Sequence, residues 1–265
     1  MTEQDVPQEE LEQVFSGRYE ITHRLGQGGQ SMVYCARRRA DGALCTVKQV
    51  RPEAIPDLEQ NLRILRRLDH PQLPRFRELG QGDGVLYIVQ DYLPGVSLKQ
   101  ILESNRRMGV PARWPKVLGW MRSACEPLAY LHESQPPILH CDLKPANLIL
   151  RQDGAVCLAD FDISRELTGQ CVPILAMSMA YASPEQKQFL PLDPRTDVYS
   201  LGVTAFQLLT HELPGERLFH RPLPRRVERL LSRCLAAHPD RGVQSGGELR
   251  EELDEILSCE RSQLS

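Results

Sequence analysis

The chain has 265 residues, a length that fits one large domain or two small lobes with cores of their own. Its 41% hydrophobic content, 25% charged content and net charge of −3 are ordinary for a globular protein, and they indicate neither nucleic acid nor an anionic membrane as the main partner. The polar start lacks the order of a signal peptide, and no apolar run approaches the roughly 18 residues of a membrane span, so we expect a soluble, cytoplasmic protein.

Eight cysteines are scattered along the chain without any C-x-x-C pair, and several, such as Cys35 and Cys157, lie inside apolar runs. Cysteines in this setting behave as small buried hydrophobic residues, so we expect free thiols and no zinc site. Three histidines also have no metal-ligand spacing and are expected at the surface or at helix caps: His132, His211 and His238.

The first third of the chain predicts a small sheet. Five runs of β-forming residues are separated by turn residues and are expected to be strands, at 19–25, 32–38, 43–50, 76–79 and 85–90. A glycine-rich turn separates the first two strands, and Ala40-Asp41-Gly42 marks a hairpin between the next two. Residues 57–68 have helical spacing with four leucines on one face. These elements predict an antiparallel sheet with one helix.

After Leu93-Pro94-Gly95 the pattern changes, and helical spacing dominates at 117–132, 198–209 and 227–237. A hairpin interrupts these helices, with strands expected at 148–150 and 156–159. The sequence therefore predicts the α+β class. The expected parts are a tail at 1–16, a small β-rich lobe at 17–92, a larger helical lobe at 93–258 and a tail at 259–265. The first fifteen residues fit either a mobile tail or a short helix.

Two features of the β-rich region suggest phosphate binding. Gly26, Gly28 and Gly29 lie between its first two strands, where glycines allow backbone N–H groups to approach a phosphate closely. Lys48 lies inside the third, apolar strand, where a lysine is costly unless its ammonium group has a partner such as phosphate. Each feature alone also fits a plain hairpin turn or a strand-end lysine that reaches solvent. A dinucleotide-binding fold is disfavoured, because a strand and not a helix follows the glycines.

The strongest segment runs from His140 to Asn147 and contains an acid, a base and an amide just before a strand. Asp160 follows the returning strand of the same hairpin, and an antiparallel hairpin brings its two ends together. Asn147 and Asp160 should therefore lie close together and offer the oxygen ligands that Mg²⁺ prefers. Asp142 is placed to accept the proton of an attacking hydroxyl group, and Lys144 to neutralise charge on a transferred phosphoryl group.

Over residues 19–257 these motifs resemble a eukaryotic-type protein kinase. The matching motifs occur in the family's order: the glycine turn, Lys48, the loop from Asp142 to Asn147, Asp160, and Ser183-Pro184-Glu185. Asp197 is similar to the aspartate that steadies the catalytic loop, and Arg241 is similar to the arginine that pairs with Glu185. The lysine two residues after the catalytic aspartate is typical of serine/threonine kinases. The sequence Ser-Pro-Glu-Gln is more similar to bacterial members of the family than to animal ones.

This resemblance implies a bilobal protein kinase fold, with an N-lobe at 17–92 and a C-lobe at 93–258. It implies transfer of the γ-phosphoryl group of ATP to a serine or threonine of a protein substrate, with Mg²⁺ as the metal and Mn²⁺ as an alternative. The catalytic residues would be Asp142, Lys144 and Lys48, and the metal ligands Asn147 and Asp160. The ATP-binding residues implied by the resemblance are Leu25, Gly26, Gln27, Gly28, Gly29, Val33, Lys48, Gln90, Asp91 and Leu93.

Two substitutions near the catalytic loop depart from the family pattern. Cys141 replaces the usual arginine, which normally binds a phosphorylated residue of the activation segment. A neutral cysteine offers no cation there, so we expect activity that does not depend on such a phosphate. Asp162 replaces the glycine of the Asp-Phe-Gly motif, which could restrict a backbone flip or alter the metal preference. A tolerated substitution is the simpler interpretation.

A third departure concerns the partner of Lys48. The helix at 57–68 should supply a glutamate, but the matching position is Asn61. Glu59 lies about 200° away around the helix, and Glu53 lies in an earlier loop. Either the register is shifted so that one of these acids reaches Lys48, with Glu59 preferred, or the lysine lacks its usual ion pair.

These departures leave two alternatives to an active kinase. A pseudokinase scaffold would bind nucleotide and partner proteins without efficient phosphotransfer. A small-molecule phosphotransferase fits less well, because such enzymes usually lack the Ser-Pro-Glu segment. An active kinase is favoured, because a scaffold has no chemical need for Asp142, Asn147 and Asp160 together.

Overall fold

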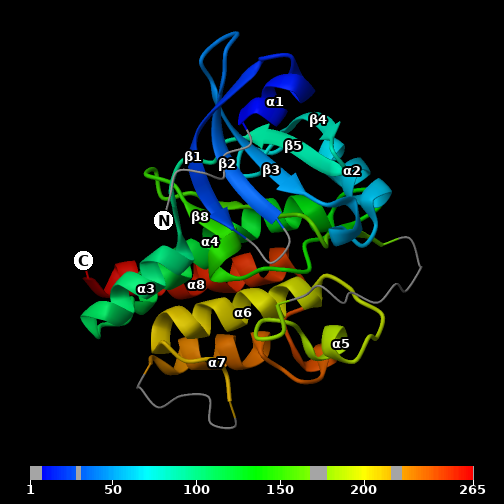
Figure 1. Cartoon of the computed structure of the whole chain (residues 1–265). Helices are drawn as coiled ribbons and strands as arrows, with labels where there is room; N and C mark the ends of the chain where they lie inside the picture. The colour runs from blue at the N-terminus through cyan, green and yellow to red at the C-terminus, as the bar shows by residue number, and fades with distance from the viewer. Residues whose placement is uncertain (1–7, 28–30, 168–177, 216–222, 265) are drawn as a thin grey trace. The chain divides into compact units, whose positions relative to one another are not determined.

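The structure is a computed structural model that describes residues 8–27, 31–167, 178–215 and 223–264. The chain forms two compact units, Met1–Leu93 and Pro94–Ser265 (Figure 1). The first contains a five-stranded antiparallel sheet, and the second is mostly helical. This confirms the predicted α+β class, with one sheet-based lobe and one larger helical lobe. Within the described ranges, no helix combines the length and apolar character needed to cross a membrane.

The sheet of the first unit has the strand order β1-β2-β3-β5-β4, and all neighbouring strands are antiparallel. Its strands are β1 (Tyr19–Gln27), β2 (Ser31–Arg38), β3 (Leu44–Val50), β4 (Phe76–Gly82) and β5 (Val85–Asp91). The five predicted strands are confirmed, and Asp41 closes the predicted hairpin by accepting from the Ala43 N–H at 3.1 Å. Because β3 is central, Lys48 lies opposite Val33 on one side and Ile88 on the other.

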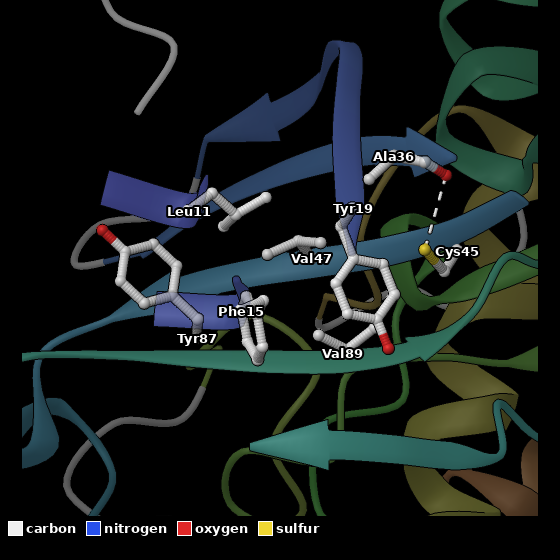
Figure 2. Packing of buried hydrophobic residues seen from close by; sticks show 8 residues of the cluster. All are labelled: Leu11, Phe15, Tyr19, Ala36, Cys45, Val47, Tyr87 and Val89. Atoms are coloured by element: carbon white, nitrogen blue, oxygen red, sulfur yellow. Dashed lines mark hydrogen bonds between the residues drawn. The ribbon is translucent and has the colours of Figure 1, made fainter. Parts of the chain in front are cut away.

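Helix α1 (Gln8–Phe15) packs against this sheet, in a region that the sequence predicts as a mobile tail or a short helix. Leu11 and Phe15 are 0% and 1% exposed and join a buried cluster with side chains from four strands (Figure 2). They are four residues apart, so they share one face of the helix. Gly80 of β4 leaves room for α1, since a Cβ there would lie 2.3 Å from Val14 Cγ1. The helix therefore belongs to the core of the first unit.

The first unit also contains the 3-10 turn η1 (Pro52–Ala54) and helix α2 (Leu58–Arg67). Asp57 caps α2 by accepting from the Gln60 N–H at 3.0 Å. The buried residues of α2 are Asn61, Ile64 and Leu65. Leu58 and Leu62, which the sequence places on the same face as Leu65, are only half-buried. The buried face of α2 is therefore rotated slightly around the helix axis from the face that carries the leucines.

Helices make up most of the second unit. They are α3 (Leu98–Met108), α4 (Trp114–His132), α5 (Pro184–Lys187), α6 (Arg195–Thr210), α7 (Arg225–Cys234) and α8 (Gly246–Leu264), with the 3-10 turn η3 (Pro239–Arg241). The three predicted helices correspond to α4, α6 and α7 and are confirmed. Helix α6 is buried along almost its whole length, as expected for a helix without a polar face. Helix α4 packs against both α6 and α8 (Figure 1).

Two small sheets of the second unit position the loops described below. Their strands are β6 (Val96–Ser97), β7 (Ile138–Leu139), β8 (Leu148–Leu150), β9 (Val156–Leu158) and β10 (Arg165–Glu166), and the 3-10 turn η2 (Pro145–Asn147) precedes β8. Strands β8 and β9 form the predicted hairpin, with Leu148 opposite Leu158. Strand β10 pairs with β7, with Arg165 opposite Leu139.

The described cysteines are free thiols, as predicted. Six of the seven are buried, and Cys259 is exposed. Burial raises the pKa of the Cys125 thiol above its ordinary value, because an apolar interior disfavours the thiolate. The six buried cysteines therefore act in packing.

Candidate active site

The segment between β7 and β8 brings three predicted site residues into contact. Lys144 Nζ donates to Asp142 Oδ2 at 2.6 Å, and the Asp142 side chain is 10% exposed. Asn147 Nδ2 donates to the Asp142 backbone carbonyl at 2.9 Å and to Oδ2 at 3.1 Å. The turn η2 folds the segment back, since the Asn147 N–H donates to the Lys144 carbonyl at 2.9 Å. An acid, an ammonium group and an amide thus meet within six residues of chain.

Asp160 follows the end of β9, next to this segment. The Ala159 N–H donates to the Asn147 carbonyl at 2.9 Å, which brings the two ends of the hairpin together as predicted. Asp160 has a φ of 64°, a left-handed conformation that non-glycine residues rarely adopt and that is concentrated at functional sites.

The side-chain oxygens of Asn147 and Asp160 are of a kind that fits a divalent cation. Because the Asp142 backbone carbonyl can only accept, the Asn147 atom that faces it is the amide nitrogen. An amide oxygen such as that of Asn147 and a carboxylate such as that of Asp160 are the kind of oxygen ligand that divalent cations such as Mg²⁺ take, and proteins commonly hold Mg²⁺ through one or two carboxylates together with substrate phosphates.

His140 connects the two sides of the site. It is 0% exposed, and its Nδ1 accepts from the Asp142 N–H at 3.3 Å. Its Nε2 lies 3.0 Å from the Ala159 carbonyl, so the geometry assigns the ring proton to Nε2. The ring also lies 4.7 Å from that of Phe161. One buried imidazole therefore joins Asp142 to the strand end that precedes Asp160.

Asp197 of α6 holds the backbone of the same segment. It is 0% exposed, its Oδ2 accepts from the His140 N–H at 2.8 Å, and its Oδ1 accepts from the Cys141 N–H at 2.8 Å. The expectation that Asp197 steadies this loop is confirmed. Burial alone would raise the pKa of Asp197, but the hydrogen bonds from His132 and His140 outweigh it, so the pKa lies below its ordinary value.

The expectation that His132 lies at the surface or at a helix cap is wrong. Its side chain is 5% exposed, and its Nε2 lies 3.0 Å from Asp197 Oδ2. The sequence contained a signal, because His132 lies four residues after Leu128 on the apolar face of α4. The other two histidines agree with the prediction, since His211 caps α6 and His238 is exposed.

Cys141 has a φ of 66° and packs in an apolar cluster with Leu139 and Ile163. Burial raises the pKa of its thiol well above the ordinary value, Asp197 adds to this effect, and the positive charge of Arg165 opposes it. Cys141 itself supplies no cation, and the positive charge that acts on it comes from Arg165 of β10, the strand that pairs with β7. Independence from an activation-segment phosphate stays a prediction.

Two residues from later in the chain contact the segment between β7 and β8. Lys144 Nζ donates to Ser178 Oγ at 2.8 Å. Gln186 Nε2, on α5, donates to the Cys141 carbonyl at 2.9 Å. Gln186 has a local signal in the sequence, the capping-box spacing to Ser183, which predicts a helix start but not the contact with the loop.

The predicted ion pair of Glu185 with Arg241 is wrong. Glu185 Oε1 accepts from Thr196 Oγ1 at 2.7 Å, so its partner lies on α6. Arg241 is exposed, and across the residues that the structure describes no ion pair joins it to Glu185. The arginine that binds the η3 turn is Arg195, whose Nη1 lies 2.6 Å from Asp240 Oδ1.

The predicted nucleotide-binding residues at the start of the chain belong to the first unit. Lys48 is 8% exposed at the centre of the sheet, which confirms a buried lysine in an apolar strand. Leu25, Gly26 and Gln27 form the exposed end of β1, where Gly26 lies opposite Val33. Two predicted residues, Gly28 and Gly29, lie outside the described residues.

The other predicted nucleotide-binding residues follow the last strand of the sheet. Gln90 and Asp91 end β5, and Leu93 ends the first unit. Arg77 Nη2 donates to Asp91 Oδ2 at 2.8 Å, and both side chains are partly exposed. The Asp91 carboxylate therefore already has a partner within the sheet.

The helix that was expected to supply an acid to Lys48 presents Asn61. Asn61 is 2% exposed on the buried face of α2, whereas Glu59 and Glu53 are exposed. Positions 59 and 61 are about 200° apart around a helix, so they do not share a face. The helix register is therefore not shifted toward Glu59, which contradicts the preference for that residue.

Comparisons with known proteins identify the family of this chain. A sequence model of the family described as protein kinase domain matches residues 19–241. The chain is 32% identical to serine/threonine-protein kinase PknB of Mycolicibacterium smegmatis, over 91% of this chain and 43% of that protein. It is 26% identical to serine/threonine-protein kinase PrkC of Bacillus subtilis, over 93% of this chain and 41% of that protein.

A human relative extends the comparison beyond bacteria. The chain is 31% identical to serine/threonine-protein kinase Nek5 of Homo sapiens, over 75% of this chain and 29% of that protein. The chain thus spans less than half the length of these curated relatives. Because the family match covers most of the chain and includes the motifs whose geometry is given above, the chain belongs to the protein kinase domain family.

Proposed function

We propose that the chain is a serine/threonine protein kinase that transfers the γ-phosphoryl group of ATP to hydroxyl groups of proteins. The contact of Asp142 with both Lys144 and Asn147, beside the strand end that leads to Asp160, carries this proposal. Phosphoryl transfer needs a base, a cation and a metal site close together, and it needs little other chemistry from the protein. The relatives are named serine/threonine-protein kinases, which supports serine or threonine as the acceptor.

Asp142 is the proposed base. Its Oδ2 already accepts from Lys144 and Asn147, so Oδ1 is the oxygen that would accept the hydroxyl proton. A well-placed base typically contributes on the order of 10²–10⁴-fold to the rate. Lys144 is the proposed counter-charge for the transferred phosphoryl group, because its ammonium lies beside the base.

Asn147 and Asp160 are the proposed ligands of a divalent ion, which supplies charge neutralisation and orientation of the phosphates when bound. We propose Mg²⁺ as the natural ion, with Mn²⁺ as the alternative, because both take oxygen ligands. Asp162 does not lie in the left-handed region where Asp160 lies, so its backbone does not require glycine. This supports the interpretation of Asp162 as a tolerated substitution.

The first unit is the proposed source of the other nucleotide contacts. Lys48 would hold the α- and β-phosphates. Its side chain belongs to a residue that is 8% exposed, and burial of an ammonium group is costly unless anionic groups contact it. The residues proposed to surround the nucleotide are Leu25, Gly26, Gln27, Gly28, Gly29, Val33, Gln90, Asp91 and Leu93. Glycines at the end of β1 would let backbone N–H groups approach the phosphates.

The test is transfer of label from γ-labelled ATP to a generic basic protein by the purified chain, with Mg²⁺ or Mn²⁺. We expect labelled phosphoserine or phosphothreonine. Asp142→Asn should lower kcat by about 10²–10⁴-fold and leave the KM for ATP near wild type. Lys48→Met should impair phosphate alignment. Asp153→Asn is a matched control, since Asp153 lies in the exposed turn of the β8–β9 hairpin.

Two results would overturn this proposal. If wild type transfers no label to substrate or to itself with either metal, the chain is a pseudokinase scaffold. If Asp142→Asn transfers label at the wild-type rate, Asp142 is not the base.

A further inference from the structure

Cys141 is held at both ends of its backbone. Its φ of 66° lies in the left-handed region, which non-glycine residues rarely adopt because it crowds the Cβ atom against the backbone. Its N–H donates to Asp197 Oδ1 at 2.8 Å, and its carbonyl accepts from Gln186 Nε2 at 2.9 Å. Asp142 is the next residue, so the conformation of Cys141 sets the direction in which the proposed base leaves the loop.

The orientation of the Gln186 amide is fixed by its other contacts. Its Oε1 accepts from the Ser183 N–H at 3.0 Å, and a backbone N–H can only donate, so the opposite end of the amide is the NH₂ group. The residue is 2% exposed, which limits competition from water. Both ends of this buried amide are therefore used, one for the cap of α5 and one for Cys141.

Gln186 reaches Cys141 from a distant part of the chain, because the two residues are 45 positions apart. We propose that Gln186 is a positioning residue that fixes the catalytic loop through the Cys141 carbonyl. This proposal rests on the proposed kinase function. An uncharged amide and the apolar cluster around Cys141 would hold the loop at a position where the family uses a charged arginine. Misplacement of a reacting group by about 1 Å can cost on the order of 10²-fold in rate.

Gln186→Glu separates the two roles of the side chain. Glutamate at this position keeps an oxygen for the Ser183 N–H, and it is a preferred residue of the capping box. An ionised carboxylate has no donor for the Cys141 carbonyl, and its oxygen would repel the carbonyl oxygen. A protonated carboxyl group has an O–H that can donate to the same carbonyl, so protonation restores the contact.

The introduced carboxyl group would be the only new titrating group near the loop. The charged groups that act on Cys141 are Asp197, Asp142 and Arg165. Asp197 is in turn bonded to His132 and His140, and Glu185 and Lys187 flank position 186 on α5. All of these groups are present in wild type as well. Comparison with wild type across the pH range therefore isolates the effect of the substitution.

The experiment measures kcat and the KM for ATP between pH 6 and pH 9, a range of about three units. We expect Gln186→Glu to lower kcat by about 10-fold or more at pH 8, with the KM for ATP near wild type. Because position 186 is buried, the pKa of the introduced carboxyl group should lie above its ordinary value of about 4.3, so kcat should recover toward wild type as the pH falls toward 6. Gln186→Met has no donor at any pH, so its kcat should be low throughout. Gln188→Glu makes the same change on an exposed residue of the same segment and should follow wild type.

Thermal unfolding of each variant is measured alongside. A low kcat without pH recovery in Gln186→Glu, together with a large loss of thermal stability, would show a merely structural role and overturn the proposal. Wild-type kcat in Gln186→Met would overturn it also, and this uncharged variant decides the matter if Gln186→Glu does not fold. If wild type itself transfers no phosphate, the proposed function fails. In that case the hydrogen bond from Gln186 to the Cys141 carbonyl is tested by hydrogen exchange of residues 138–148. If this bond holds the loop, the amides of these residues should exchange faster in Gln186→Met than in wild type.

Discussion

Lys144 Nζ donates to Asp142 Oδ2 at 2.6 Å and to Ser178 Oγ at 2.8 Å, so one ammonium group joins the loop before β8 to the segment before α5. The Ser178 hydroxyl oxygen can accept this hydrogen bond while its O–H donates to another group. This contact fixes the direction of the lysine, since a lysine side chain has several rotatable bonds.

Ser178→Ala should therefore lower kcat while the chain stays folded. A hydrogen bond to a charged group contributes about 1.5–3 kcal/mol, so loss of about 10-fold in kcat is expected if the lysine is needed in the transition state. Ser178→Thr keeps the hydroxyl and should retain most of the activity. Steady-state kinetics with γ-labelled ATP measures both variants, and equal rates for Ser178→Ala and wild type would contradict the role of this contact.

Asp197→Asn should destabilise the second unit. The substitution turns one acceptor oxygen into a donor that faces a backbone N–H, and a buried donor without an acceptor costs about 1–3 kcal/mol. Urea unfolding at pH 7 measures the loss. Asp254→Asn is the control, because Asp254 is an exposed partner of Arg122 and such pairs contribute about 0–1 kcal/mol.

The same residue predicts an acid dependence. The folded-state pKa of Asp197 lies below its ordinary value of 3.8, so its contribution is fully present above that pH and is lost as the pH falls through the folded value. The difference between wild type and Asp197→Asn should therefore shrink below about pH 4. A difference that stays constant down to pH 2, well below the ordinary carboxyl pKa of about 3.9, would contradict the lowered pKa.

Phe15→Ala should destabilise the first unit, because the ring is 1% exposed in the cluster shown in Figure 2. Truncation of a buried phenylalanine typically costs about 3–5 kcal/mol. Thermal or urea unfolding of the whole chain measures the effect. Gln13→Ala, on the exposed side of the same helix, should change stability by less than about 0.5 kcal/mol. Similar stability of the two variants would show that α1 does not belong to the core.

Tyr19→Phe should flatten the loss of stability at alkaline pH. Burial and then the hydrogen bond to Glu78 raise the pKa of Tyr19 from 10.0 to about 12. A raised pKa means that this contribution is fully present below pH 10 and is lost as the pH rises toward 12. Unfolding free energies between these two pH values should fall less steeply in Tyr19→Phe than in wild type, and parallel curves would contradict the shift. Tyr87, whose pKa burial also raises, contributes to both curves.

Several features of this protein were determined by the sequence over short distances. The five strands and the helices α4, α6 and α7 were predictable because β-forming runs, turn residues and helical spacing act within a few residues. The contact between Asn147 and Ala159, the residue before Asp160, was predictable for the same reason, because an antiparallel hairpin brings its two ends close together.

Other features were decided by the tertiary structure. Asp197 binds the backbone N–H of His140, which is 57 positions away, and Gln186 reaches Cys141 across 45 positions. The partner of Glu185 is Thr196 and not Arg241, and Asn61 occupies the buried face of α2. No local pattern specifies such pairs, because they depend on which helix faces and loops the packed core brings together.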